Sequence, residues 1–205
     1  MLPRAFLSLV LLAPASAFAN DGPLLIDHLV KYDDSGIWKR SNQTGLAAGA
    51  AVAVIGGAMF VDSDSRLGRT FDQALDSMAF TAGTTTLMKY GFSRERPSEN
   101  PDPNSFFSGK GHQSFPSGEV AEITAVVTPF IAEYGGDHPW VYGLALLPAY
   151  DAVARVKVHG HWQSDVLVGA GIGAAFGVYA HHRKTPFIAG VLPGGGFIFG
   201  YRKSF

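Results

Sequence analysis

The chain has 205 residues, of which 47% are hydrophobic and 16% are charged, with 25 glycines, no cysteine and a formal net charge of -1. A chain of this length and apolarity can bury a core within one domain, and its composition excludes an intrinsically disordered protein. The lack of cysteine excludes a disulfide scaffold and a thiolate metal site, and the balanced charge argues against general nucleic-acid binding. The composition leaves a soluble domain and a membrane protein as alternatives.

The N-terminus has the layout of a secretory signal peptide. Arg4 precedes an apolar run over residues 5–13, and Ala17, Phe18 and Ala19 form an A-x-A cleavage site. We therefore predict a signal peptide over residues 1–19, a single domain over residues 20–205 and a periplasmic location. An uncleaved anchor is the alternative, although the apolar run is short for a membrane span.

The hydrophobic periodicity predicts an all-α fold, a helical bundle with a short C-terminal β-hairpin over about residues 187–205. The helices are expected over residues 24–33, 42–61, 67–89, 118–134, 138–155 (with a bend at Pro148) and 161–182. Residues 90–117 are rich in proline and glycine and form a long loop of the kind that is usually functional or disordered. Residues 45–61 provide one marginal membrane span, and the pattern argues against several spans.

Three short blocks combine basic, acidic and small residues. They cover residues 89–97 (KYGFSRERP), 115–119 (FPSGE) and 155–165 (RVKVHGHWQSD). Lys89 stands at the end of a predicted helix, and Pro97 forces Arg96 into an extended conformation, so the two cations can point at one place. By contrast, Arg94 and Glu95 are predicted to belong to a solvated charge cluster.

The third block pairs a histidine with a carboxylate. His161 and Asp165 are four residues apart, so a helix places them on one face, where the carboxylate can hold one ring nitrogen and leave the other as a nucleophile or base. On one continuous helix Arg155 would point away from His161, but Gly160 can break the helix and let both converge. A surface ion pair beside an unrelated arginine is the alternative.

The second block reads as the start of a helix. Ser117 is a favourable N-cap residue, and Gly118 allows an anion to approach the backbone closely. The amide groups and the dipole at a helix N-terminus favour a phosphate group. A plain helix cap explains Ser117 equally well, but it does not explain the two basic blocks on either side.

The order K-x6-R-P, P-S-G and R-x5-H-x3-D resembles the type 2 phosphatidic acid phosphatase (PAP2) and vanadium haloperoxidase superfamily. The resemblance implies a helical bundle and a phosphohydrolase that uses a phosphohistidine intermediate, with no metal ion and no other cofactor. It also implies catalytic roles for two residues and phosphate-binding roles for five others. An eighth position, that of Glu119, departs from the family pattern. The catalytic pair is His161 as nucleophile and Asp165 as its orienting group, and the phosphate ligands are Lys89, Arg96, Ser117, Gly118 and Arg155.

Two positions depart from the family pattern. Ala154 replaces the serine that usually precedes the third-block arginine, and Glu119 replaces the histidine that usually protonates the leaving group. Three interpretations of Glu119 are open. It is the catalytic acid itself; or it is a first-turn carboxylate favoured by the helix dipole, with His112 or His159 as the acid; or it marks a site that binds phosphate and hydrolyses it poorly.

The leading functional hypothesis is a phosphatase that acts on a lipid phosphate or a small phosphomonoester, with association to a membrane surface. A vanadate-dependent haloperoxidase and a weakly catalytic phosphate-binding or lipid-binding homologue are the alternatives. The expected partner is a phosphorylated lipid or small molecule and not a nucleic acid. The sequence pattern leaves the individual substrate and the oligomeric state open.

Overall fold

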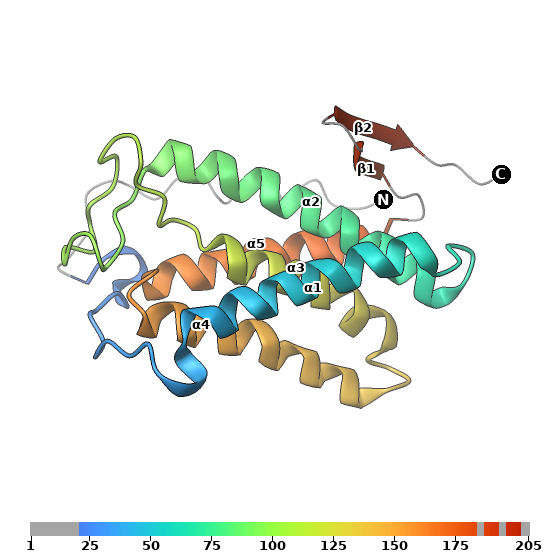
Figure 1. The fold of residues 1–205 in the computed structure, drawn as a ribbon, viewed down its shortest axis with the longest axis horizontal. Helices are drawn as coiled ribbons and strands as arrows, with labels where there is room; N and C mark the ends of the chain where they lie inside the picture. The colour runs from blue at the N-terminus through green and yellow to red at the C-terminus, as the bar shows by residue number, and fades with distance from the viewer. Residues whose placement is uncertain (1–20, 184–186, 193–195, 202–205) are drawn as a thin grey trace.

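The protein is described by a computed structural model that covers residues 21–183, 187–192 and 196–201, and the signal peptide predicted for residues 1–19 lies outside this part of the chain. Five α-helices form an elongated bundle, accompanied by three 3-10 helices and one hairpin (Figure 1). In chain order the elements are η1 (Pro23–Leu25), η2 (Gly36–Trp38), α1 (Arg40–Phe60), α2 (Arg66–Phe92), α3 (Gly118–Tyr134), η3 (Pro139–Ala145), α4 (Leu146–Lys157), α5 (Gln163–His181), β1 (Phe187–Leu192) and β2 (Gly196–Tyr201). The prediction of an all-α bundle is confirmed.

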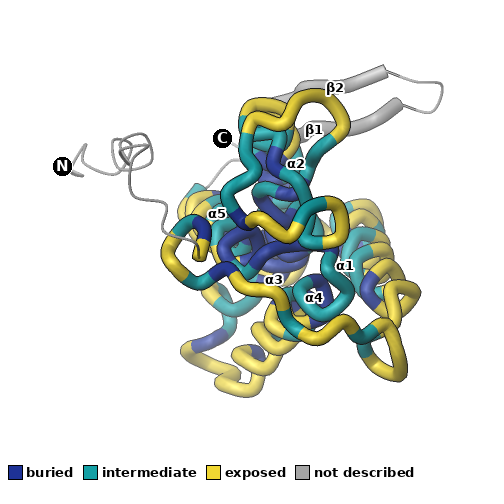
Figure 2. The backbone as a smooth tube through the Cα atoms, turned by 90° about the vertical axis from the view of Figure 1, so that its left-hand side faces the viewer, coloured by how far each residue is buried: buried dark blue, intermediate teal, exposed yellow. Residues whose placement is uncertain are grey.

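Helix α3 is the centre of the bundle and contacts each of the other four α-helices. Apolar residues face inward over most of its length, which is why it can be surrounded, and the end-on view places buried backbone in the middle of the molecule (Figure 2). The buried apolar residues of α3 are Val120, Ala121, Ile123, Ala125, Val126 and Val127. The second block opens this helix and is thereby attached directly to the rigid core.

Helices α3 and α5 approach each other closely through glycines. A Cβ atom added at Gly173 would lie 2.1 Å from the backbone oxygen of Ala121, and one added at Gly169 would lie 2.5 Å from the oxygen of Ser117. Side chains larger than hydrogen at these two positions would force the helices apart. The close packing fixes the start of α3 beside the start of α5, where the second and third blocks lie.

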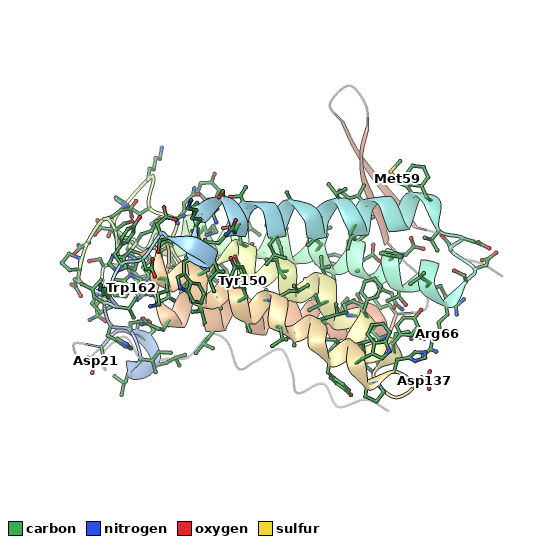
Figure 3. All side chains as sticks on the ribbon, turned by 60° about the horizontal axis from the view of Figure 1, so that its bottom comes forward. Asp21, Met59, Arg66, Asp137, Tyr150 and Trp162 are labelled. Atoms are coloured by element: carbon green, nitrogen blue, oxygen red, sulfur yellow. The ribbon has the colours of Figure 1, made fainter. Side chains whose placement is uncertain are left out.

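The connecting segments gather at one end of the bundle. The loop between α2 and α3, the connection between α4 and α5, and the N-terminal segment up to α1 all lie there (Figure 1). Figure 3 places Trp162 at this end, whereas Arg66 and Asp137 lie at the opposite end. All three blocks therefore meet at the same end of the molecule.

The predicted helix over residues 24–33 is wrong. Only the short turn η1 forms there, and Leu24 and Leu25 adopt positive φ angles of 65° and 57°. The segment instead crosses the α4–α5 connection, with the His28 amide donating to Gln163 Oε1 at 3.2 Å and the Asp33 amide donating to the Lys157 carbonyl at 3.0 Å. These long-range hydrogen bonds outweigh the weak local preference for helix.

The helix predicted over residues 138–155 is divided into η3 and α4. The division falls before Pro148, which lies in the first turn of α4 and not at a bend. A proline is tolerated in the first turn because the amide group that it lacks would have no partner within the helix. The other four predicted helices are confirmed with small changes at their ends.

Strands β1 and β2 form the antiparallel hairpin expected near the C-terminus, with Phe187 opposite Tyr201 and Leu192 opposite Gly196. The hairpin stands outside the bundle, and β1 contacts α2 (Figure 1). Of the helices in the described residues, α1 is long and apolar enough to cross a membrane, and only 11% of its apolar window is buried. The single marginal span expected near residues 45–61 therefore corresponds to α1.

Candidate active site

The centre of the site is a histidine in the short connection between α4 and α5. The side chain of His161 is only 3% exposed, and its Nδ1 atom lies 3.5 Å from Asp165 Oδ2. Burial lowers the pKa of His161 to about 3, although the nearby Asp165 carboxylate acts in the opposite direction. The imidazole is therefore neutral at physiological pH, and a carboxylate facing Nδ1 favours the tautomer that leaves the lone pair on Nε2.

Asp165 is fully buried and receives three hydrogen bonds. Its Oδ2 atom accepts from the Ser114 hydroxyl at 2.5 Å and from the Trp162 amide at 2.9 Å, and its Oδ1 atom accepts from Arg94 Nη1 at 2.5 Å. Burial alone would raise the pKa of Asp165, but the interaction with His161 and the charge of Arg94 outweigh it and hold the pKa below its usual range. Asp165 is thus a fixed anion behind the histidine.

Arg94 is a correction to the sequence-based prediction, which placed it in a solvated cluster. Its side chain is completely buried, and its Nη2 atom donates to Asp27 Oδ2 at 2.7 Å. Asp27 is buried as well and accepts from the amide and the hydroxyl of Ser164, at 2.7 and 2.6 Å. A buried guanidinium is tolerated here because two buried carboxylates, Asp27 and Asp165, compensate its charge.

No local pattern singles out Asp27, which stands in a segment that was expected to be an ordinary amphipathic helix. The one sequence feature that pointed to this network was Arg94 itself, a cation two residues before Arg96 in the first block. Sequence reasoning therefore missed the Asp27–Arg94–Asp165 network, although it identified the histidine that the network supports.

The two first-block cations converge as expected. Lys89 Nζ and Arg96 Nη2 both donate to the carbonyl oxygen of Gln113, at 2.7 and 3.5 Å, and Arg96 Nη1 donates to the carbonyl of Gly160 at 2.9 Å. Burial and the neighbouring charge of Arg96 lower the pKa of Lys89 to about 8. Arg96 thereby connects the first block to the loop that carries His161.

The second block places a hydroxyl group in the same region. Ser117 occupies the N-cap position of α3, but its side chain makes no capping hydrogen bond. Its Oγ atom is buried and has no hydrogen-bond partner among the described residues, whereas its backbone amide donates to the carbonyl of Asp165 at 3.0 Å. A buried hydroxyl without a partner is costly, and a phosphate oxygen would satisfy it. A Cβ atom at Gly118 would lie 3.5 Å from Lys89 Cε, so this glycine adjoins the first-block lysine.

Arg155 reaches the site because helix α4 ends before Gly160. Helix α4 ends at Lys157, and a Cβ atom at Gly160 would lie 2.6 Å from Arg155 Nη2, so the glycine leaves room for the guanidinium. Burial lowers the pKa of Arg155 to about 10, which keeps it charged at neutral pH. The predicted helix break between Arg155 and His161 is confirmed, but it falls at Val158 and at His159, which has a positive φ of 52°, and not at Gly160.

Glu119 lies between two arginines. Its Oε2 atom is 2.7 Å from Arg40 Nη1 and 3.4 Å from Arg155 Nε, and its side chain is 22% exposed. Both contacts use the same carboxylate oxygen, so Glu119 is an ion-pair partner of the two arginines. This geometry favours the second interpretation of Glu119, a carboxylate that is not the acid.

The two histidines of that interpretation differ in their surroundings. His159 Nε2 is 2.8 Å from the carbonyl of Val30, and its ring packs edge-on against Tyr32. His112 lies next to Gln113 in the loop, with Nδ1 at 3.3 Å from Glu99 Oε2. His159 is therefore engaged with the N-terminal segment, and His112 is the histidine that lies beside the first-block cations. The described residues contain no group of three or more histidine and carboxylate side chains placed to hold a metal ion.

The chain is similar to a known protein family and to individual known proteins. Residues 73–188, more than half of the chain, match the family model described as the PAP2 superfamily. A curated relative, the Lipid A 1-phosphatase of Porphyromonas gingivalis, is 35% identical over 102 residues, which are 49% of this chain and 20% of that protein. The chain thus matches about a fifth of the length of this relative. The crystal structure of Aquifex aeolicus LpxE aligns with 67% of this chain and 82% of its own, with a TM-score of 0.47 and 20% identity.

Proposed function

Because the chain belongs to the PAP2 superfamily, we propose that it is a phosphatase that hydrolyses the phosphate ester of a lipid through a phosphohistidine intermediate. The observation that carries the proposal is a buried, neutral His161 held beside a fixed Asp165 anion. The same region contains three cations and the hydroxyl of Ser117, which has no hydrogen-bond partner within the part of the chain that the structure describes. Phosphoryl transfer depends mainly on positioning and on charge stabilisation, and this set of groups supplies both.

The reaction proceeds in two steps. His161 Nε2 attacks the phosphorus, the bond from phosphorus to the ester oxygen breaks, and the leaving oxygen takes up a proton from a general acid, for which His112 is the candidate, to give the alcohol. Water then attacks the phosphorus, loses a proton to the same general acid in its deprotonated form and breaks the phosphorus–nitrogen bond, which releases inorganic phosphate and restores the imidazole. Lys89, Arg96 and Arg155 compensate the charge on the phosphate oxygens, and Asp165 stabilises the cationic ring of the intermediate.

A lipid is supported as the substrate by two independent features. The Porphyromonas gingivalis relative is a Lipid A 1-phosphatase by name. Helix α1, which begins beside the site at Arg40, presents Val52, Ile55 and Met59 on one face with exposed fractions of 70%, 43% and 69%. An exposed apolar stripe of this kind is typical of a surface that meets a membrane or another apolar partner. The proposed location is therefore a membrane surface of the periplasm.

The experiment is a substrate panel run on wild-type protein and on His161→Ala, with and without detergent. We expect hydrolysis of a lipid phosphate in detergent by the wild type and a loss of roughly 10³-fold or more in His161→Ala. Radiolabelled phosphate from the substrate should be trapped on the wild-type protein in an acid-labile form, as expected for phosphohistidine. His182→Ala is the matched control, because this exposed histidine follows the C-terminal end of α5, where Nδ1 lies 2.8 Å from the Val178 carbonyl and the ring packs against His181.

Three results would contradict the proposal. Activity against soluble esters alone would exclude the lipid substrate. Halide oxidation after addition of vanadate, without ester hydrolysis, would indicate a haloperoxidase. Phosphate binding with no turnover and no trapped label would indicate a binding protein.

A further inference from the structure

Arg40 lies outside the three blocks, yet it is joined to the third-block arginine through two shared acceptors. Glu119 Oε2 contacts Arg40 Nη1 at 2.7 Å and Arg155 Nε at 3.4 Å. Gln43 Oε1 accepts from Arg40 Nη1 at 3.1 Å and from Arg155 Nη1 at 3.3 Å. We propose that Arg40 is a positioning residue of the phosphate site, which binds Glu119 and so leaves the charge of Arg155 available to the substrate phosphate.

The shared acceptors are held in fixed positions. Gln43 is completely buried, and its Nε2 atom donates to the carbonyl of Trp38 at 2.8 Å, which orients its oxygen toward the two arginines. Glu119 stands in the first turn of α3, directly after Ser117 and Gly118. The two guanidinium groups and the carboxylate of Glu119 are therefore brought together from three helices, α1, α3 and α4, at the end of the bundle that carries His161.

The distances from Glu119 to Arg40 and to Arg155 indicate which arginine compensates the charge of the carboxylate. A carboxylate beside a phosphate-binding arginine competes with the phosphate for that arginine. Glu119 is closer to Arg40 than to Arg155, so Arg40 takes the shorter contact and most of the compensation. If Arg40 were removed, Arg155 would be the remaining arginine in contact with Glu119 and would be neutralised by it.

A second carboxyl group increases the need for Arg40. Asp151 lies one helical turn before Arg155 on α4, is completely buried, and has no hydrogen-bond partner on either oxygen among the described residues. Burial and the charge of Glu119 raise the pKa of Asp151 to about 7, while Arg155 and Arg40 act in the opposite direction. Without Arg40, two carboxyl groups would surround a single arginine.

The inference also gives a physical role to the Glu119 departure. A histidine at this position would bring no fixed negative charge to hold two guanidinium groups together. Glutamate supplies that charge, and Arg40 prevents it from cancelling Arg155. The inference rests on the proposed function only in taking Arg155 as a phosphate ligand.

The test measures binding of inorganic phosphate by calorimetry, without turnover. The proteins are wild type, Arg40→Ala, Arg40→Lys, Glu119→Gln and the double variant Arg40→Ala/Glu119→Gln. We expect Arg40→Ala to weaken phosphate binding about tenfold, Glu119→Gln to change it less than about threefold, and the double variant to recover most of the loss, because the competing anion is gone. Arg40→Lys keeps a cation near Glu119 and should lie between Arg40→Ala and wild type.

Arg66 provides a matched control. It is 41% exposed, against 44% for Arg40, and it forms a comparable ion pair with Glu133 and Asp137 at the opposite end of the bundle (Figure 3). Arg66→Ala should leave phosphate binding unchanged. Circular dichroism of each variant shows that it is folded, and Arg40→Lys carries the test if Arg40→Ala does not fold.

The outcomes separate this inference from the proposed function. Wild-type affinity in Arg40→Ala, or a double variant as weak as Arg40→Ala, overturns the inference while hydrolysis by the wild type still supports a phosphatase. Arg40-dependent phosphate binding in a protein that hydrolyses no ester overturns the proposed function alone. A Glu119→Gln variant that binds phosphate normally but loses turnover selectively with a poor leaving group identifies Glu119 as the acid. That result overturns the assignment of Glu119 as the ion-pair partner through which Arg40 acts.

Discussion

At the scale of single residues, the site consists of charged groups whose burial changes their protonation behaviour. Lys89 shows this effect at a pH that experiments can reach with the folded protein, since burial and the charge of Arg96 lower its pKa to about 8. Lys89 is therefore protonated below about pH 8 and loses its charge as the pH rises through that value. His161 does not change its charge near neutral pH, because burial lowers its pKa to about 3 and it is neutral well above that value.

The affinity for inorganic phosphate should therefore fall as the pH rises. We expect the dissociation constant of the wild type to increase by up to about tenfold per pH unit above pH 8, because deprotonated Lys89 no longer attracts the anion. Lys89→Arg should remove this dependence up to about pH 9, since an arginine stays protonated there. Lys110→Arg, a change at an exposed loop lysine, should leave the wild-type profile unaltered. A wild-type dissociation constant that is constant between pH 7 and pH 9.5 would exclude the assigned role of Lys89.

The residues of the site divide by how far their partners lie along the chain. His161, Asp165, Lys89 and Arg96 could be identified from the sequence because each stands in a short block with a characteristic spacing. Arg94 could not, because its compensating partner Asp27 is 67 residues away in a segment without a motif. A charge that is buried by a distant carboxylate looks, in the sequence, the same as a charge in solvent.

At the scale of elements, the contact between α3 and α5 positions the second block against the third. Gly173 and Gly171 are two residues apart on α5 but lie on different faces. A Cβ atom at Gly173 would meet the backbone of Ala121, whereas one at Gly171 would meet nothing within 4 Å. The same substitution should therefore have opposite effects at the two positions.

Gly173→Ala should lower the free energy of unfolding by about 1–3 kcal/mol, because the backbone of α3 cannot move away without disturbing the core. Gly171→Ala should raise it by about 0.5–1 kcal/mol, the usual gain of alanine over glycine in a helix. Urea unfolding followed by circular dichroism at 222 nm measures both values. Equal effects of the two substitutions would show that the helices are not in close contact along Gly173.

Four of the six predicted helices match the structure, because each is a long apolar or periodic stretch that can be recognised in its own sequence. The N-terminal segment was mispredicted for a different reason. Its backbone amide groups donate hydrogen bonds to Gln163 and Lys157. Its buried carboxylate, Asp27, accepts hydrogen bonds from Ser164 and Arg94. Such partners are set by the docking of the segment against the α4–α5 connection and not by its local pattern.

At the scale of the whole molecule, the exposed apolar face of α1 is the surface that we propose meets a membrane. We predict that protein freed of detergent in the presence of phospholipid vesicles co-sediments with them. The double change Val52→Ser/Met59→Ser should weaken this binding about tenfold or more, because two large apolar side chains no longer enter the lipid. Both residues are exposed, so the fold should tolerate the change.

Control substitutions on α5 distinguish a specific surface from general stickiness. Leu167→Ser/Val178→Ser alters two apolar side chains with exposed fractions of 56% and 45%. We expect this variant to co-sediment like the wild type. Equal co-sedimentation of all three proteins would show that α1 is not the surface that meets the lipid.

The sequence by itself determined the family and most of the helices of this protein. Block order, the spacing of His161 and Asp165, and the apolar periodicity are all local properties, and local properties survive in a linear sequence. Only the tertiary structure decided which charges are buried together. The Asp27–Arg94 ion pair and the Arg155–Gln43 hydrogen bond join residues 67 and 112 positions apart, and polar contacts at such a separation leave no periodic or spacing signal in the chain.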